Sequence, residues 1–120
     1  MLWRDATDWI GEVDFLETGS PADSGMTVSE AFSPDSTYRS MVIRDLGLSQ
    51  ERLFVEDSGT GRRFALEWPQ RLPWRPVSGL VWISDSLLVF TQWSQPGFGY
   101  CYAVDVPGQR LVLALALSGE

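Results

Sequence analysis

The chain has 120 residues, of which 44% are hydrophobic and 21% charged, a composition typical of one globular domain. The formal net charge is −7, which disfavours nucleic acid and anionic membrane as partners because both bind cation-rich surfaces. The chain has no Lys, no His and a single cysteine, which excludes Ser-His-Asp and Cys-His catalysis, Schiff bases, His-ligated metals and an internal disulfide.

Nothing in the sequence resembles a targeting or membrane-spanning segment. The N-terminus is acidic and lacks the basic-then-apolar order of a signal peptide. The longest apolar run, 111–117, is much shorter than the roughly 20 residues that cross a bilayer. The lone Cys101 gives no sign of an oxidising compartment. We therefore expect a soluble, cytoplasmic protein.

Residues 1–25 form an acidic N-terminal segment, which we interpret as a solvated face. Its six acidic residues face one base, Arg4; they are Asp5, Asp8, Glu12, Asp14, Glu17 and Asp23. Trp9, Val13 and Leu16 share one helical face, and Asp8 could cap such a helix. Residues 13–15 also alternate as a strand does, and Gly11 disfavours a helix, so a strand is favoured. Residues 18–25 are predicted to be a loop.

Residues 26–68 show the regular pattern of a four-stranded meander. The turns are marked by Ser-Pro-Asp-Ser at 33–36, by Gly47 and by Ser-Gly-Thr-Gly at 58–61. The strands predicted between them are 26–32, 38–45, 52–57 and 63–68. Residues 69–77 follow, with three prolines in 69–76, and predict an extended, exposed linker.

A second meander is predicted within 78–117. Four short runs rich in β-branched and aromatic residues, 80–83, 87–90, 100–104 and 111–117, are separated by turn residues and read as antiparallel strands. Two of the runs are apolar at nearly every position, which predicts that both faces of this sheet are covered. Such a sheet needs neighbours.

The two meanders repeat one plan. Phe32-Ser-Pro-Asp-Ser36 matches Trp82-Ile-Ser-Asp-Ser86. Residues 53–57 match 101–105, and 60–63 match 107–110, at a spacing of roughly 50 residues. An aromatic-Ser-Pro-Asp turn before a strand, followed by an apolar-Asp-x-x-x-Gly hairpin, resembles the blades of WD40-like and TolB-type β-propellers, although the Gly-His and Trp-Asp pairs of WD40 repeats are absent.

That resemblance implies an all-β fold of two four-stranded antiparallel meanders, 26–68 and 78–117, joined by the linker 69–77 in a single domain of residues 26–120. Two units do not close a ring of four to eight blades. Several chains would then associate, or the two sheets would instead form a β-sandwich or open barrel with the N-terminal segment covering an edge, or the chain would be a piece of a larger propeller.

The residues with chemical potential favour structural roles. Asp35, Asp57, Asp85 and Asp105 recur at equivalent turns, where carboxylates accept hydrogen bonds from turn amides. Cys101 lies in an apolar strand without a base to activate it, and is interpreted as an inert buried thiol. Residues 59–63 lack the Lys and helix of a phosphate-binding loop. We expect no catalytic residue, no cofactor and no metal site.

Trp, Tyr and Arg side chains gather in and beside the linker and one hairpin, and these residue types anchor protein interfaces. The candidate interface residues are Trp68, Arg71, Trp74, Arg75, Trp93, Phe98 and Tyr100. Packing of the linker against the sheet is the alternative. The favoured hypothesis is a non-enzymatic module that self-associates or binds another protein. A carboxylate-dependent ligand-binding domain or hydrolase, and an accessory piece of a larger propeller, are the alternatives.

Overall fold

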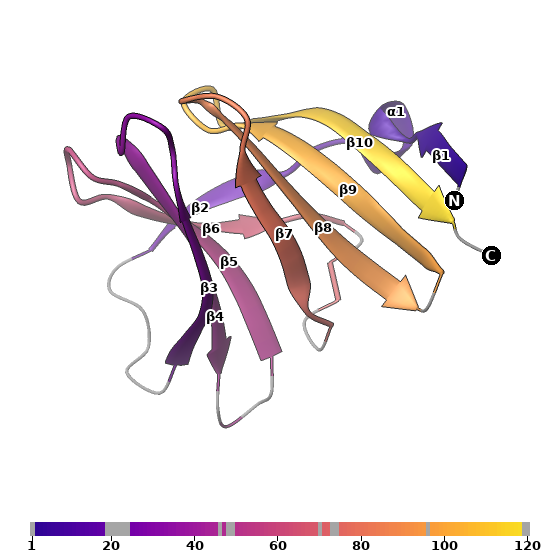
Figure 1. The fold of residues 1–120 in the computed structure, drawn as a ribbon, viewed down its shortest axis with the longest axis horizontal. Helices are drawn as coiled ribbons and strands as arrows, with labels where there is room; N and C mark the ends of the chain where they lie inside the picture. Colours follow the sequence, from indigo (N-terminus) through magenta and orange to yellow (C-terminus); the bar gives the residue numbers. More distant parts are fainter. Residues whose placement is uncertain are drawn as a thin grey trace.

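In a computed structural model, the chain folds into two antiparallel β-sheets with one short helix (Figure 1). The structure describes residues 2–18, 25–45, 47, 50–69, 71–72, 75–95 and 97–118. Its elements are β1 (Leu2–Asp5), α1 (Thr7–Ile10), β2 (Asp14–Thr18), β3 (Gly25–Phe32), β4 (Tyr38–Asp45), β5 (Gln50–Asp57), β6 (Arg63–Glu67), β7 (Val77–Trp82), β8 (Leu87–Gln95), β9 (Phe98–Asp105) and β10 (Arg110–Ser118).

Each sheet has five strands. Sheet I has the order β2-β6-β5-β4-β3, and sheet II has the order β1-β10-β9-β8-β7. Within them, β3 to β6 and β7 to β10 each run as a meander, so all eight strands predicted between residues 26 and 117 are present. The described strands of the two sheets share no hydrogen-bonded pair, and the sheets face each other across one core in a sandwich-like arrangement.

The fifth strand of each sheet comes from the acidic N-terminal segment, which the expectation of four-stranded sheets missed. β1 pairs with β10 along Leu2–Asp5, and β2 pairs with β6. Between them the chain passes from sheet II to sheet I, as Figure 1 shows. Ala6, Ile10 and Val13 are buried on the way and join the core. The segment therefore ties the two sheets together at one side.

This segment contains both a helix and a strand: Thr7–Ile10 form α1 and Asp14–Thr18 form β2. α1 is a single turn in which Ile10 N–H donates to Ala6 C=O, and Gly11 ends it at a φ of +88°. The carboxylate near its start is Asp5, which accepts from Thr7 N–H at 2.9 Å, and not Asp8 as the sequence suggested. Residues 14–18 then form strand β2.

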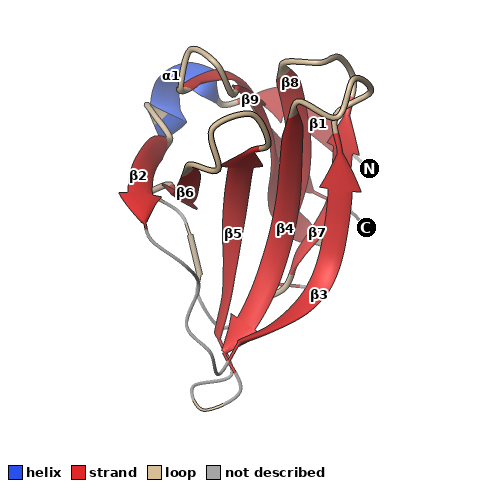
Figure 2. Ribbon diagram, turned by 90° about the vertical axis from the view of Figure 1, so that its left-hand side faces the viewer, coloured by secondary structure: helices blue, strands red, loops and turns tan. Residues whose placement is uncertain are grey.

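The core lies between the sheets because each strand alternates one apolar face inward. Its centre is aromatic: the Trp68 ring lies 4.9 Å from Phe90 and 5.5 Å from Tyr102. The side view in Figure 2 shows the long, twisted strands β3, β4 and β5 lying in front of sheet II. β3 and β7, the first strands of the two meanders, contact each other.

The linker is turned, and partly buried, where the sequence predicted extended and exposed chain. Arg71 N–H donates to Trp68 C=O and Arg75 N–H donates to Leu72 C=O, each at 3.0 Å. Gln92 of β8 is 3% exposed, and both the nitrogen and the oxygen of its side-chain amide bind the linker. Its Nε2 donates to Leu72 C=O and Arg75 C=O, and its Oε1 accepts from Leu72 N–H at 3.0 Å. Proline has no backbone N–H to donate to a neighbouring strand, so the buried side-chain amide of Gln92 holds the linker instead.

Candidate interaction surface

The sequence predicts that sheet II is covered on both faces, but among the described residues its inner face packs against other elements while its outer face carries exposed apolar side chains. Leu88, Phe90, Tyr102 and Val104 point inward and are fully or almost fully buried. The alternate residues form what we call the outer face of sheet II: Trp3, Val81, Leu87, Val89, Thr91, Trp93, Gly99, Cys101, Ala103, Leu113, Leu115 and Leu117.

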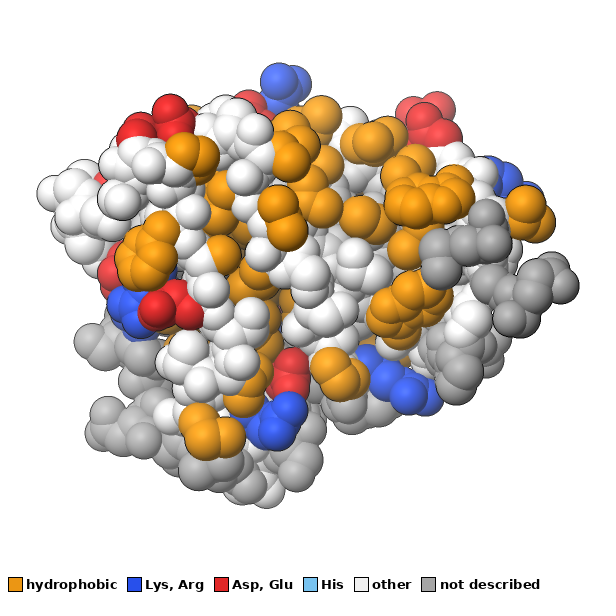
Figure 3. Space-filling view, viewed as in Figure 1, with side chains coloured by type: hydrophobic (Ala, Val, Ile, Leu, Met, Phe, Trp, Pro, Cys, Tyr) orange, Lys and Arg blue, Asp and Glu red, His pale blue; other side chains and the backbone are white. Residues whose placement is uncertain are grey.

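Large apolar side chains on this outer face are open to solvent. Val81 is 50% exposed, Trp3 is 60% exposed and Leu113 is 37% exposed; Ile83, which follows β7, is 62% exposed. In Figure 3, hydrophobic side chains reach the surface over the area that β7 to β10 occupy in Figure 1. The charged residues of the outer face stand at its strand ends: Asp5, and Asp105 with its cross-strand partner Arg110, whose Nε lies 3.4 Å from the Asp105 carboxylate. Contiguous apolar surface of this kind marks interaction sites in globular proteins.

Gly99 lets β9 lie very close to the backbone of β8 at one end of the outer face of sheet II. A Cβ at Gly99 would lie 2.7 Å from Gln92 O and 2.8 Å from Trp93 Cα, so only glycine fits beside this part of β8. Trp93 and Leu117 occupy the cross-strand positions on either side of Gly99. Leu117 is 4% exposed while Trp93 is half-buried. Of the predicted interface residues, Trp93 is the one that belongs to this outer face.

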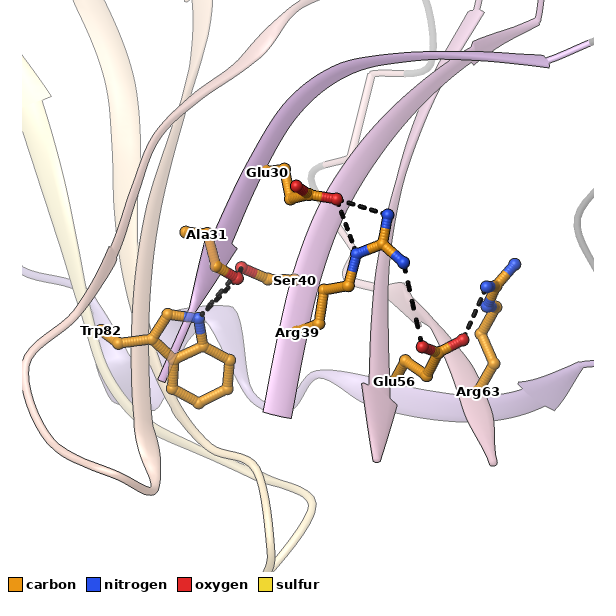
Figure 4. Close-up of polar contacts among 7 residues, drawn as sticks. All are labelled: Glu30, Ala31, Arg39, Ser40, Glu56, Arg63 and Trp82. Carbon is orange, nitrogen blue, oxygen red and sulfur yellow. Dashed lines mark hydrogen bonds and ion pairs between the residues drawn. The ribbon is translucent and has the colours of Figure 1, made fainter. Parts of the chain in front are cut away.

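The outer face of sheet I differs in that charged side chains lie across its interior, although Leu16 and Phe32 on the same face are 52% and 53% exposed. Met41, Phe54 and Ala65 form a second, smaller buried cluster there. Above them runs a ladder of ion pairs, Glu30–Arg39–Glu56–Arg63, with Nη2 of Arg63 2.6 Å from Glu56 (Figure 4). The Arg52 guanidinium lies 5.4 Å above the Phe54 ring. Long charged side chains cover apolar surface with their stems while their heads stay in water.

Two predicted interface residues lie in the core of the chain itself. Trp68 is 5% exposed and packs on Phe90 and Tyr102; Tyr100 is 7% exposed and packs on Trp9 and Phe98. Their aromatic character reflects packing between the sheets. Burial raises the pKa of the Tyr100 hydroxyl, an effect that the nearby positive charge of Arg4 opposes.

The linker arginines also bind within the chain. Nη2 of Arg71 donates to Glu51 C=O at 3.1 Å, and its Nε lies 3.5 Å from Glu67. Burial lowers the pKa of the Arg71 guanidinium. Arg75 is half-buried, and its backbone carbonyl is held by Gln92. Trp74 lies outside the described residues. Contacts within the chain therefore account for the Arg71 side chain, whereas the Arg75 Nε is buried without a hydrogen-bond partner in the described structure.

Phe98 lines two adjoining hollows beside β1, which we call the aromatic cleft. One hollow, of about 330 Å³, is also lined by Leu2 and Trp3; the other, of about 210 Å³, is also lined by Trp9 and Tyr100. Arg4 and Ala116 line both. The sequence analysis did not predict this site, because β1 and α1 are brought beside β9 only by the long-range pairing of the N-terminus with β10.

The four repeated aspartates hold turns, as the sequence predicts. Asp35 accepts from Thr37 N–H at 3.0 Å, and this hydrogen bond lowers the pKa of its carboxyl. Asp57 accepts from Gly59 N–H, and Asp105 from Gly108 N–H. Asp85 accepts from the backbone N–H of Asp35 at 3.0 Å, so it joins equivalent turns of the two meanders. Among the described residues no group of three or more Cys, Asp or Glu side chains could hold a metal ion.

Cys101 and Tyr102 show the two faces of β9. Cys101 is a free thiol, partly exposed on the outer face of sheet II, where the sequence predicts a buried one. Tyr102 is 1% exposed and its hydroxyl has no hydrogen-bond partner in the described structure. Burial strongly raises the pKa of this hydroxyl, and Tyr100 adds to the effect. The Tyr102 side chain therefore contributes to the core through packing of its ring and not through hydrogen bonds of its hydroxyl.

Comparison with known proteins gives the fold and no more. No family model matches the chain, and no curated protein matches it. A crystal structure of a "putative conserved lipoprotein" from Clostridium novyi NT is similar, with a TM-score of 0.58 at 13% identity over 83% of this chain and 68% of that one. At this identity the likeness concerns architecture alone. No helix in the described part of the chain could span a membrane.

Proposed function

We propose that this chain is a non-enzymatic all-β module that self-associates, and that the outer face of sheet II is the contact surface. The observation that carries the proposal is the exposure of Val81 and Leu113, and of Ile83 just after β7, on a strand surface whose charged residues stand at the strand ends. The same chain covers the outer face of sheet I with its ion-pair ladder. Both outer faces expose large apolar side chains, and it is the charged ladder across the interior of sheet I that distinguishes a solvated face from a docking face.

Charge supports a second copy as the occupant. Two chains of net charge −7 repel each other at a distance, so a self-contact is favoured where no carboxylates meet. The interior of the outer face of sheet II is free of charged residues, and its two aspartates stand at the ends of strands. A strongly charged partner would find no complementary group in the middle of this face.

The size of the face is sufficient. Five strands spaced about 4.8 Å apart, with about 3.3 Å per residue along each, give roughly 600 Å². Two such faces would bury roughly 1,200 Å², which is at the lower end of stable protein interfaces. Sheets pack face to face about 10 Å apart through interdigitating side chains, and these β-branched and leucine residues suit that packing.

Two arginine variants test the proposal. Val81→Arg and Leu113→Arg place a cation on the face at exposed positions, and both lower the magnitude of the net charge, so lost association cannot be ascribed to greater repulsion. Leu16→Arg, at a 52% exposed position on the outer face of sheet I, is the matched control. We expect light scattering to show monomers for the two face variants and unchanged assembly for the control. Equal assembly of all three would refute the assigned face.

The resemblance to propeller blades and the cytoplasmic location belong to this proposal as predictions. The two successive meanders, β3 to β6 and β7 to β10, support the blade-like interpretation, because a propeller blade is a four-stranded antiparallel sheet. The carboxylate-dependent alternative has no such support, because its aspartates are bonded to turn amides.

A further inference from the structure

The aromatic cleft lies on the inner side of the strand pair β1 and β10, away from the face assigned to self-association. Arg4 pairs with Ala116, and Ala116 pairs with Tyr100, so these three side chains share one side of sheet II. The outer-face residues Leu115 and Leu117 alternate with them. Arg4, Ala116 and Tyr100 of the cleft therefore lie on the opposite side of the sheet from the outer face, and Trp3, on the edge strand β1, borders both surfaces.

Arg4 is unusual among the arginines of this protein. Seven of the nine, at positions 39, 44, 52, 62, 63, 71 and 110, form ion pairs in the described structure, while Arg4 is exposed and lies within 4 Å of no described carboxylate. The adjacent Asp5 does not neutralise it, because its carboxylate accepts two hydrogen bonds from Thr7 at 2.7 and 2.9 Å. An unpaired guanidinium in a chain of net charge −7 is available to an anion.

The walls beside Arg4 are aromatic and already ordered. Phe98 meets Tyr100 edge-to-face at 5.5 Å, and Trp9 lies 5.7 Å from Tyr100. Tyr100 is anchored in the core, whereas Trp9 keeps 65% of its surface exposed. Ring faces held in this way bind apolar groups with little loss of conformational freedom. Trp9 lines the smaller hollow, of about 210 Å³, and Phe98 lines it together with the adjoining hollow of about 330 Å³, which lies within the size range of small-molecule sites.

We infer that the aromatic cleft binds a small apolar carboxylate, with the carboxylate paired to Arg4 and the apolar body on Trp9 and Phe98. Charge complementarity selects this class. A cationic ligand would meet the Arg4 guanidinium, and a neutral apolar one would leave it unused. A guanidinium and a carboxylate can share two parallel hydrogen bonds, which adds orientation to attraction.

The test is calorimetric titration with three probes of one shape: 4-phenylbutyrate, 4-phenylbutan-1-ol and 4-phenylbutylamine, up to roughly 5 mM because small ligands gain little affinity per atom. We expect saturable binding of the carboxylate and at least roughly tenfold weaker binding of the alcohol and the amine, which equals about 1.4 kcal/mol. Equal heats for all three probes, or no saturation with phenylbutyrate, would overturn the inference.

Variants locate the site. Arg4→Gln and Trp9→Ala alter exposed side chains, so both should fold, and each should weaken phenylbutyrate roughly tenfold. Arg110→Gln, at the far end of β10, is the charge-matched control and should bind as the parent does. The monomeric Val81→Arg variant should also bind normally, which separates failure of this inference from failure of the proposed self-association. Unchanged affinity in Arg4→Gln would remove the site.

Discussion

The indole Nε1 of Trp82 donates a hydrogen bond to the hydroxyl of Ser40 at 3.0 Å, and thereby joins β7 of one sheet to β4 of the other (Figure 4). The Ser40 hydroxyl in turn donates to Ala31 C=O at 3.1 Å. The Trp82 ring stacks on Tyr38 at 5.8 Å. Apolar packing is not directional, so this buried polar pair helps to fix how sheet II sits on sheet I, together with the hydrogen bonds from Val77 N–H to the Glu51 carboxylate and from Asp35 N–H to Asp85.

Ser40→Ala should destabilise the fold without abolishing it. The substitution removes both hydrogen bonds of a fully buried hydroxyl, but Trp82 Nε1 keeps a contact with Ala31 C=O at 3.3 Å. We expect a loss of about 1 to 2 kcal/mol in the free energy of unfolding, measured by urea denaturation. Ser78→Ala, at an exposed position of β7, is the control and should lie within about 0.5 kcal/mol of the parent. A Ser40→Ala variant with the same free energy of unfolding as the parent would show that the Ser40 hydroxyl does not help to set the sheet arrangement.

Gln92→Ala should release the linker. Three hydrogen bonds to Leu72 and Arg75 are lost, and we expect a destabilisation of about 2 to 4 kcal/mol at roughly 1 kcal/mol each. The linker should open locally more often than the whole chain unfolds, so trypsin should cleave after Arg71 much faster in this variant than in the parent. Ser40→Ala serves as a comparison that is destabilised with its linker intact. Equal cleavage rates in both variants would indicate that Gln92 acts only through overall stability.

Tyr102→Phe should leave the fold intact and make it more resistant to alkali. The hydroxyl is buried without a partner, so its removal should change the free energy of unfolding by less than about 1 kcal/mol at pH 8. Burial raises the pKa of Tyr102 in the folded state above its usual value of 10.0. The unfolded chain therefore loses this proton first, and stability falls as pH rises beyond about 10.

Urea denaturation at pH 8 and pH 10.5 measures this difference. The parent should lose more stability between the two pH values than Tyr102→Phe does. Tyr38→Phe is a weaker comparison, since that hydroxyl is only partly buried. Parallel loss in the parent and Tyr102→Phe would mean that another group governs alkaline unfolding.

Gly99→Ala should disrupt the edge of the outer face of sheet II. The added methyl group would meet backbone atoms of Gln92 and Trp93 at 2.7 and 2.8 Å, and backbone cannot move aside cheaply. We expect a destabilisation of about 1 to 3 kcal/mol from overpacking. Gly61→Ala has open space around it but a φ of +75°, so its cost of about 1 to 2 kcal/mol would come from the backbone alone. A Trp93 fluorescence change confined to Gly99→Ala would distinguish the two causes.

Local patterns in the sequence predict the two meanders well. Ser-Pro-Asp-Ser at 33–36 and the Gly-Thr-Gly turn ending at Gly61 form the turns expected, because Pro and Gly fix backbone angles through short-range sterics. The repeated aspartates bind turn amides for the same local reason. Strands β4 and β5 begin and end within two residues of the predicted positions.

Long-range pairing was not predictable from these patterns. Nothing local in Leu2–Asp5 indicates that it pairs with β10, so β1 and the aromatic cleft are not predicted, whereas the strand favoured at residues 13–15 is confirmed by β2. The sequence pattern favours Trp68 and Tyr100 as interface residues, because aromatic residues near loops occur both in hydrophobic cores and in contact surfaces, but both are buried in the core. The apolar runs at 80–83 and 111–117 did signal the outer face of sheet II, but the sequence could not say whether this chain or another covers it.

The solution mass of the parent chain, measured by light scattering after size exclusion over a range of concentrations, tests the central claim most directly. The account predicts a discrete dimer with twice the mass of one chain, which dissociates on dilution, because two outer faces of sheet II bury an area at the lower end of stable interfaces. A chain that stays monomeric at every concentration would contradict self-association and leave the exposed Val81, Ile83 and Leu113 to a different protein.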